Sequence, residues 1–178
     1  HDELRRQRQM CIRDSYDHIG YDQGEICNGA DDDGSGTVSL LTIAKTFQNA
    51  YNDGHKPKRG ILFLMVSGEE KGLFGSKHYT ENPAFPLKKT CTNLNIDMIG
   101  RQDTIQPNNN YIYLIGSDKI SKQLHIINEQ INNKYINFHL DYRYNSEEDP
   151  NRFYYRSDHY NFAKNDIPVI FYFGGLHE

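Results

Sequence analysis

Short apolar segments alternate with amphipathic segments along most of the chain. Residues 61–66 are continuously apolar, as expected for a strand buried on both faces of a mostly parallel sheet. Residues 37–51 carry apolar side chains close to a 3.6-residue period, which predicts a helix. The same patterns predict, in chain order, helix 72–81, strand 90–98, strand 111–115, helix 117–132, edge strand 138–142, helix 157–164 and strand 168–173.

Strands that alternate with helices predict an α/β fold, a mostly parallel twisted sheet flanked by helices. A length of 178 residues fits one domain, and no repeat or low-complexity tract is visible. The net charge of -4 and the lack of a basic stripe argue against a nucleic-acid partner. No apolar run is long enough for a transmembrane segment. Three cysteines without C-x-x-C spacing predict neither a disulfide framework nor a thiolate metal site.

Residues 1–15 differ in character from the rest of the chain. They are charged and Arg-rich, and their pattern predicts no strand before Tyr16. They resemble the translation of a sequencing adapter, so we expect this stretch to be non-native and the domain to comprise residues 16–178. The genomic DNA upstream of codon 16 tests this expectation.

Two acidic clusters stand where a predicted strand ends and a predicted helix begins. The first contains Asp31, Asp32 and Asp33, and the second contains Glu69 and Glu70. In open α/β sheets, sites form outside the carboxyl ends of the strands, and carboxylates from two units can converge on one cation there. The adjacent glutamates suggest one metal ligand and one general base. Helix capping is the alternative, because Asp and Glu favour helix N-termini.

Four ordered motifs resemble the bacterial branch of the M28 family of zinc aminopeptidases. They are NGADDDGSG at 28–36, SGEEKGLFGS at 67–76, NIDMIG at 95–100 and RSDHYNF at 156–162. The resemblance extends from about Tyr16 to the last residue. It implies the phosphorylase/hydrolase-like fold of zinc exopeptidases and a pair of zinc ions that hydrolyse N-terminal residues from peptides.

The resemblance also implies roles for individual residues. Asp32 matches the ligand that bridges the two zinc ions, Asp97 a ligand of one ion and Glu70 a ligand of the other. Glu69 matches the general base. Asp17 matches an outer carboxylate that orients a His ligand two residues before it.

Two departures from the family pattern concern the His ligands. Ser15 occupies the position of the first ligand, and His18 is the alternative donor nearby. Residues 175–178 match the start of the motif that carries the second ligand, so His177 is expected beside the substrate and not on the metal. Each zinc therefore lacks one His, and the resemblance implies a fragment of the enzyme.

The resemblance assigns three further positions. Asp158 and His159 are expected to face the site and to bind the substrate, the alternative being a helix cap and a surface His. Asp33 matches the position of a cis peptide bond that is frequent in the family.

The sequence thus predicts a metal-dependent aminopeptidase that acts on peptides, with zinc as cofactor and manganese or cobalt as other candidates. A glutaminyl cyclase with a single zinc and a non-catalytic binding domain that has lost its metals are the alternatives. The set Asp32, Glu70 and Asp97, together with Glu69, favours the peptidase. Since bacterial relatives are often exported, we expect a periplasmic or secreted location.

Overall fold

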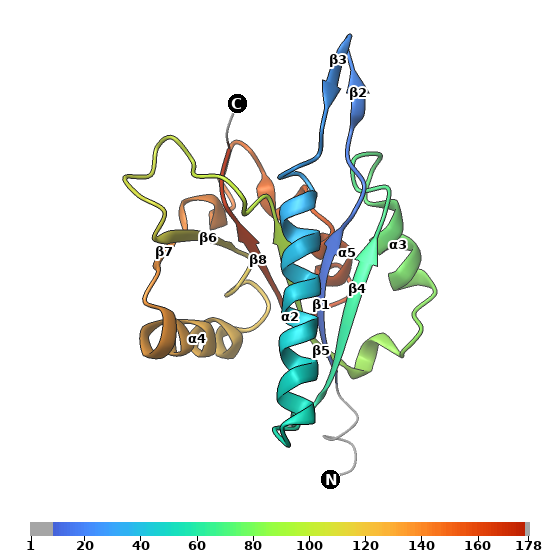
Figure 1. The fold of residues 1–178 in the computed structure, drawn as a ribbon, viewed down its shortest axis with the longest axis vertical. Coiled ribbons are helices and arrows are strands. Elements are labelled where there is room, and N and C mark those ends of the chain that lie inside the picture. Colours follow the sequence, from blue (N-terminus) through green and yellow to red (C-terminus); the bar gives the residue numbers. More distant parts are fainter. Residues whose placement is uncertain (1–8, 177–178) are drawn as a thin grey trace.

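A six-stranded sheet forms the centre of the molecule in the computed structural model, which describes residues 9–176 (Figure 1). Neighbouring strands are parallel, except that β6 and β8 are antiparallel. This arrangement confirms the mostly parallel α/β sheet. The strands, in spatial order, are β4 (Gly60–Val66), β1 (Gln9–Ser15), β5 (Thr90–Asp97), β8 (Val169–Phe173), β6 (Tyr111–Ile115) and β7 (His139–Asp141).

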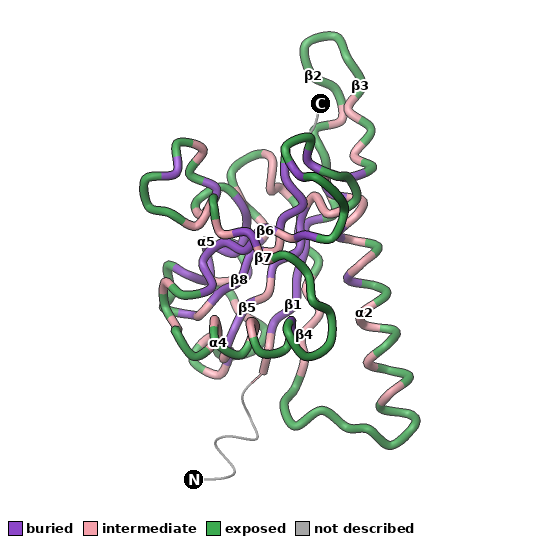
Figure 2. The backbone as a smooth tube through the Cα atoms, turned by 90° about the vertical axis from the view of Figure 1, so that its left-hand side faces the viewer, coloured by how far each residue is buried: buried purple, intermediate pink, exposed green. Residues whose placement is uncertain are grey.

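Helices pack on both faces of the sheet, with α2 on one face and α3 and α5 on the other (Figures 1 and 2). The helix α4 lies on the α2 side, where Asn128 accepts a hydrogen bond from the Tyr172 hydroxyl of β8. These helices confirm the four predicted ones, within about three residues at each end except that α4 begins at Lys122 and not at Ser117. Their bounds are α2 (Gly34–Asn52), α3 (Phe74–Glu81), α4 (Lys122–Ile131), which a π-helical turn (Asn132–Ile136) extends, and α5 (His159–Ala163).

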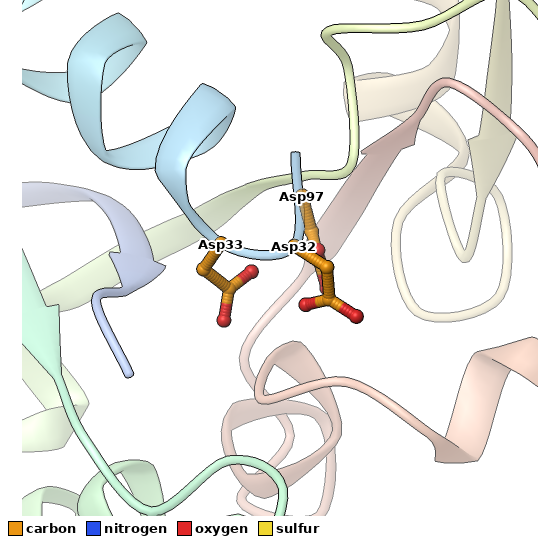
Figure 3. Close-up of side chains that lie close together, drawn as sticks. All are labelled: Asp32, Asp33 and Asp97. Atoms are coloured by element: carbon orange, nitrogen blue, oxygen red, sulfur yellow. The ribbon is translucent and has the colours of Figure 1, made fainter. Parts of the chain in front are cut away.

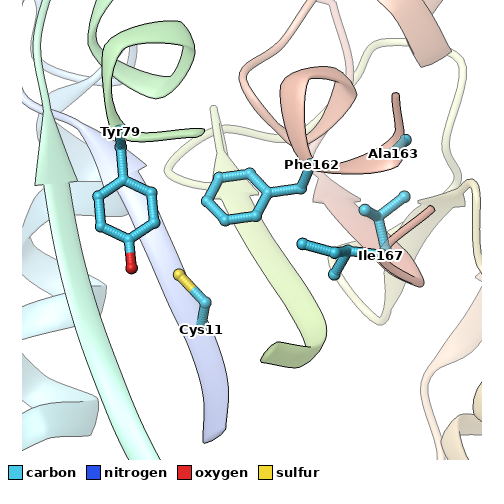
Figure 4. Packing of buried hydrophobic residues seen from close by; sticks show 6 residues of the cluster. Cys11, Tyr79, Phe162, Ala163 and Ile167 are labelled. Carbon is cyan, nitrogen blue, oxygen red and sulfur yellow. The ribbon is translucent and has the colours of Figure 1, made fainter. Parts of the chain in front are cut away.

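Apolar clusters hold these layers together. Cys11 and Ile12 are neighbours on β1, and they enter opposite clusters because successive strand side chains alternate between faces. The α2 side buries Ile12, Leu40 and Ile96. The α3 and α5 side buries Cys11, Tyr79, Phe162, Ala163, Ile167 and Val169 (Figure 4). A third cluster, around β6 and β8, contains Tyr111, Tyr113, Ile115, Phe153, Phe171 and Phe173.

The strand β1 differs from the sequence prediction. We expected no strand before Tyr16, but Gln9–Ser15 pairs with both β4 and β5. Arg13 concealed the strand pattern, because an arginine is normally exposed and this one is fully buried. Its Nη1 lies 2.6 Å from Oδ2 of Asp158, and this ion pair makes its burial tolerable. That residues 1–15 are non-native stays a prediction.

The strand β4 was expected to be buried on both faces, but it lies at an edge of the sheet and most of its residues are only partly buried. Its apolar run nevertheless has a structural reason, because helices cover both faces of this edge. Ile61 and Phe63 pack toward α2, whereas Leu62 and Leu64 pack toward α3 and α5. Only Val66 at its end is fully buried.

A small hairpin was not predicted. Its strands β2 (Gly20–Asp22) and β3 (Glu25–Cys27) are antiparallel and project beyond the carboxyl end of β1 (Figure 1).

Within residues 9–176, no helix has both the length and the apolar character that crossing a membrane requires.

Candidate active site

Acidic side chains gather at the carboxyl ends of β4 and β5. Asp32 and Asp33 lie in the loop that leads into α2, and Asp97 is the last residue of β5. Glu69 and Glu70 come after β4, in the loop before α3. This edge of the sheet is where an open α/β fold places its sites, as the sequence predicted.

Hydrogen bonds join the loop before α2 to the segment after β5. Asp31 accepts a hydrogen bond from the backbone N–H of Gly100 at 2.6 Å. The hydroxyl of Ser35 accepts one from the N–H of Ile99 at 3.0 Å. The two bonds hold the first acidic cluster beside Asp97.

A close backbone approach also shapes this edge. Gly174, just after β8, donates its N–H to the carbonyl of Met98 at 3.0 Å. A Cβ at position 174 would lie 2.2 Å from that oxygen, so the contact requires glycine. Met98 itself has a positive φ of 50°, an unusual conformation for a side chain that lines the site.

Asp32, Asp33 and Asp97 converge on one point (Figure 3). One carboxylate oxygen of each lies within 4.8 Å of the others, as ligands of one ion would. The resemblance implied Asp32 and Asp97 as ligands of one ion and Glu70 as a ligand of the other, and among the described residues Asp33 joins Asp32 and Asp97 in a single group. The role of Glu70 at a second ion stays a prediction. The peptide bond between Asp32 and Asp33 is cis, at the position that the resemblance implied.

The chemistry of these carboxylates fits a divalent cation. Oδ1 of Asp33, Oδ1 of Asp97 and Oε1 of Glu70 are buried without a hydrogen-bond partner among residues 9–176. Buried charged groups are normally paired or coordinate a metal. Asp33 precedes α2 but makes no side-chain cap, and instead accepts a hydrogen bond from the Ser15 hydroxyl. Helix capping therefore does not account for Asp33.

Burial is the main cause of raised pKa values in this cluster, and like charges add to it for several members. Burial, followed by the charges of Asp97 and Glu70, raises the pKa of Asp32 to about 7. Burial, followed by the charge of Asp97, raises the pKa of Asp33 to about 11. Burial also raises the pKa values of Asp97 and Glu70 above their ordinary range. A bound cation would reverse these shifts, because it favours the ionised carboxylates.

Glu69 lies on the wall of a cavity that Asp32, Glu70 and Asp97 also line. Burial, followed by the charges of Asp97 and Glu70, raises the pKa of Glu69 to about 8. Its backbone N–H points to Oδ1 of Asp17 at 3.5 Å, so Asp17 lies next to the loop that carries Glu69. The role of Asp17 in orienting a ligand His stays a prediction. A carboxyl group whose pKa lies near neutrality is suited to accept and return a proton.

This acidic cavity is enclosed by residues from five parts of the chain. It is lined by Asp32, Glu69, Glu70, Asp97, Met98, Phe153, Arg156, Ser157, Phe171, Phe173 and Leu176. The site thus combines acidic side chains on one part of its wall with aromatic side chains on another.

Ser157 is a site residue that sequence reasoning missed. Its hydroxyl donates to Oδ2 of Asp97 at 3.0 Å and accepts a hydrogen bond from Nδ2 of Asn95 at 2.9 Å. Asn95 and Asp97 are two residues apart on β5 and share one face, which was a signal available in the sequence. The sequence pattern placed Ser157 only at the start of a predicted helix, so its contact with Asp97 was not anticipated.

The structure corrects the expectation for Asp158 and His159. Both side chains are fully buried and neither lines the acidic cavity. Asp158 accepts hydrogen bonds from Arg13 and Ser76, while His159 packs between two aromatic rings. Burial, with the positive charge of Arg13, lowers the pKa of His159 to about 3, so its ring is neutral. These two residues support the fold beneath the site.

The histidine considered as an alternative donor, His18, does not join the three carboxylates. His18 is exposed and lies outside the three-carboxylate group within the described part of the chain. His177 lies outside the described residues, whereas Leu176 before it lines the acidic cavity.

The profile of the peptidase family M28 matches residues 14–177, nearly the whole chain. The chain belongs to peptidase family M28. Two curated relatives match parts of the chain. The M28 chain is 43% identical over 74 residues to a vacuolar membrane protease of Verticillium alfalfae, a match that covers 42% of this chain and 7% of the relative. It is 31% identical over 103 residues to aminopeptidase YwaD of Bacillus subtilis, which covers 52% of this chain and 22% of the relative.

Solved structures share the fold. A zinc aminopeptidase from Bacillus subtilis, BSAP, superposes with a TM-score of 0.73 at 22% identity over 94% of this chain and 36% of its own. A glutaminyl cyclase from Bacteroides thetaiotaomicron superposes with a TM-score of 0.66 at 18% identity over 93% of this chain and 59% of its own. The M28 chain thus spans less than two thirds of the length of each of these proteins.

Proposed function

We propose that this M28 chain carries the catalytic core of a zinc-dependent aminopeptidase, which removes N-terminal residues from peptides with a pair of zinc ions. The main support is the acidic cavity, where Glu69 lies beside Asp32, Glu70 and Asp97. The names of two relatives, an aminopeptidase and a zinc aminopeptidase, support the same reaction.

The carboxylates divide into metal ligands and a proton carrier. Asp32, Asp33 and Asp97 would hold one zinc, and Glu70 with Asp32 would hold the second. When bound, zinc supplies Lewis-acid polarisation of the scissile carbonyl. Ser157 orients Asp97 for this role through its hydrogen bond.

Glu69 would act as the general base. It takes a proton from the water that attacks the carbonyl carbon, and it gives this proton to the nitrogen of the leaving amine as the peptide bond breaks. Asp17, which borders the N–H of Glu69, would position the loop that carries the base.

Metal content is the first test. We expect at least one zinc ion per chain after equilibration with zinc and exhaustive dialysis, and a loss of this zinc in Asp97→Asn. A chain that retains no zinc would contradict the metal part of the proposal.

Hydrolysis of a leucyl anilide tests the reaction itself. Glu69→Gln should lower the rate about a hundredfold or more, because proton transfer by a positioned side chain contributes at least that much. Glu148→Gln, an exposed carboxylate in the segment between β7 and α5, is the matched control and should keep the wild-type rate. Equal rates for the two variants would remove Glu69 from the mechanism.

Cyclisation of N-terminal glutamine is the alternative reaction, because glutaminyl cyclases share this fold. A Gln-initiated peptide that cyclises, without any hydrolysis of the leucyl anilide, would establish it.

An exported location likewise stays a prediction, which the vacuolar membrane proteases among the relatives support.

A further inference from the structure

A second cavity adjoins the acidic one on the side of α3 and α5. Glu69, Glu70 and Arg156 line both cavities, so the two meet at these residues. The wall of the second cavity also contains Lys77 from α3 and Lys164 from the end of α5. We call this second cavity the basic cleft.

The three cations of the basic cleft are available to a ligand. Lys77 has one carboxylate neighbour, Glu81, at 4.0 Å, and both side chains are more than half exposed, so this pair is weak. Within residues 9–176, Arg156 and Lys164 have no carboxylate within ion-pair distance. Their charges lie instead over aromatic rings, with Lys164 Nζ at 5.1 Å from the centre of the Tyr160 ring.

Aromatic rings give the cleft a firm wall. Tyr155 and Tyr160 line it and pack edge to face, with ring centres 5.0 Å apart. Beneath them, Asn161 is buried and donates hydrogen bonds to the Leu73 carbonyl and to Ser76, which joins α5 to α3. The cations therefore project from a packed surface formed by two helices that are held together.

The two cavities share Glu69, Glu70 and Arg156 but differ in their other charged side chains, because the acidic cavity adds Asp32 and Asp97 whereas the cleft adds Lys77 and Lys164. The chain as a whole has a net charge of -4, yet the cleft gathers cations next to the most acidic part of the molecule. A carboxylate on a ligand would be repelled by Glu69 and Glu70 and attracted by Lys77 and Lys164. A ligand with an amino group at one end and a carboxylate at the other would thus bind in one orientation.

We propose that the basic cleft binds a carboxylate on the leaving portion of the peptide. The carboxylate is either the C-terminal group of a dipeptide or tripeptide, or an acidic side chain that comes after the scissile bond. This inference rests on the proposed aminopeptidase function, since it assigns the amino end of the substrate to the acidic cavity. It makes short or acidic peptides the preferred substrates.

Binding measured in EDTA separates the cleft from the reaction, because no turnover is needed. The dissociation constants of Leu-Ala, Leu-Ala amide and Leu-Glu amide are measured by calorimetry or by NMR titration. We expect the two peptides with a carboxylate to bind about tenfold more tightly than Leu-Ala amide at low salt, about threefold for each exposed cation engaged. The advantage should shrink as salt rises, because exposed charges are screened.

Charge-neutral variants locate the effect. In Lys77→Gln/Lys164→Gln, the ratio of the Leu-Ala amide constant to the Leu-Ala constant should fall to near one. Lys45→Gln, on α2 across the sheet, is the matched control and should keep the wild-type ratio. Arg156→Gln provides a second, independent reduction of the ratio if the double variant does not fold.

The outcomes distinguish the carboxylate site in the basic cleft from the aminopeptidase function. Equal binding of acid and amide by the wild type, or a ratio that survives in the cleft variants, would overturn the carboxylate site. Tighter binding of Leu-Ala supports a site for C-terminal carboxylates, and tighter binding of Leu-Glu amide supports one for acidic side chains. A normal ratio in a chain that fails to hydrolyse the leucyl anilide would reject the aminopeptidase function and retain the cleft.

Discussion

Among the buried carboxylates of residues 9–176, two groups differ in how their oxygens are satisfied. One is the three-carboxylate group at the acidic cavity, which contains Asp33 and Asp97. The other lies around β6 and β7 and contains Asp103 and Asp141. All four side chains are less than a tenth exposed, so burial alone does not distinguish the two groups.

The second group is fully engaged by hydrogen-bond donors. Asp103 accepts hydrogen bonds from the Tyr113 hydroxyl at 3.1 Å and from the N–H of Leu176 at 3.3 Å. Asp141 accepts hydrogen bonds from Gln106 at 2.9 Å and from Arg143 at 2.8 Å. These bonds hold the loop after β5 and the segment after β8 against β6.

The pKa values of the carboxylates in the two groups differ because their hydrogen-bond partners differ. Burial acts to raise the pKa of Asp141, but the hydrogen bonds and charge of Arg143 outweigh it and hold the pKa below its ordinary value. In the acidic cavity burial and like charges act together, and the pKa values rise. A cluster of buried carboxylates that each keep an oxygen without a donor is therefore a better sign of a ligand site than burial alone.

The largest expected effect is stabilisation by zinc. A free zinc concentration a thousandfold above the dissociation constant should raise the free energy of unfolding by about 4 kcal/mol. Asp97→Asn should abolish this increment, whereas Asp141→Asn should keep it on a lower baseline. Urea unfolding with zinc or with EDTA measures both quantities. An undiminished increment in Asp97→Asn would place the cation elsewhere.

The pH dependence of stability should reveal Glu69. Its pKa rises on folding from 4.5 to about 8, so the group stabilises the fold when protonated. That contribution is complete below pH 4.5 and is lost as the pH rises through 8. In EDTA, Glu69→Gln should therefore gain stability relative to wild type between pH 5 and 8, by about 1 kcal/mol per pH unit. The difference between Glu148→Gln and wild type should stay flat over that range, and a flat difference for Glu69→Gln would contradict the raised pKa.

Removing a carboxylate that is fully hydrogen-bonded should change the stability of the fold without changing zinc binding. Asp141→Asn should lower the free energy of unfolding in EDTA by about 2 kcal/mol, because it breaks a charge-assisted pair with Arg143. Asp97→Asn should be neutral or stabilising under the same conditions, since it removes repulsion and can still accept the Ser157 hydrogen bond. If both substitutions destabilise equally, the contrast between the two groups fails.

The smallest effect concerns position 15. The Ser15 hydroxyl donates to Asp33, so a side chain at this position reaches the metal ligands. Ser15→His adds a nitrogen donor of the kind that zinc prefers, and we expect about tenfold tighter zinc binding by calorimetry. Ser15→Ala, which adds no donor, should not tighten binding. A His variant no tighter than the Ala variant would exclude this position as a ligand site.

Much of this protein was determined by the sequence itself. Apolar periodicity predicted α2, β5, β6 and β8 within a few residues, because local spacing decides which face of an element can be buried. The four motifs indicated the family, and they pointed to Asp32, Glu69, Glu70 and Asp97, which line one cavity.

Only the tertiary structure decided which side chains meet. Arg13 and Asp158 are 145 residues apart, and their ion pair makes a buried strand from a segment that seemed too charged to form one. The same packing buries Asp158 and His159 away from the acidic cavity and brings the Ser157 hydroxyl to Asp97. That Asp33 joins Asp32 and Asp97 depends on how the loop before α2 meets the end of β5. Local sequence patterns do not encode such distances, because they arise from contacts between elements that are distant in the chain.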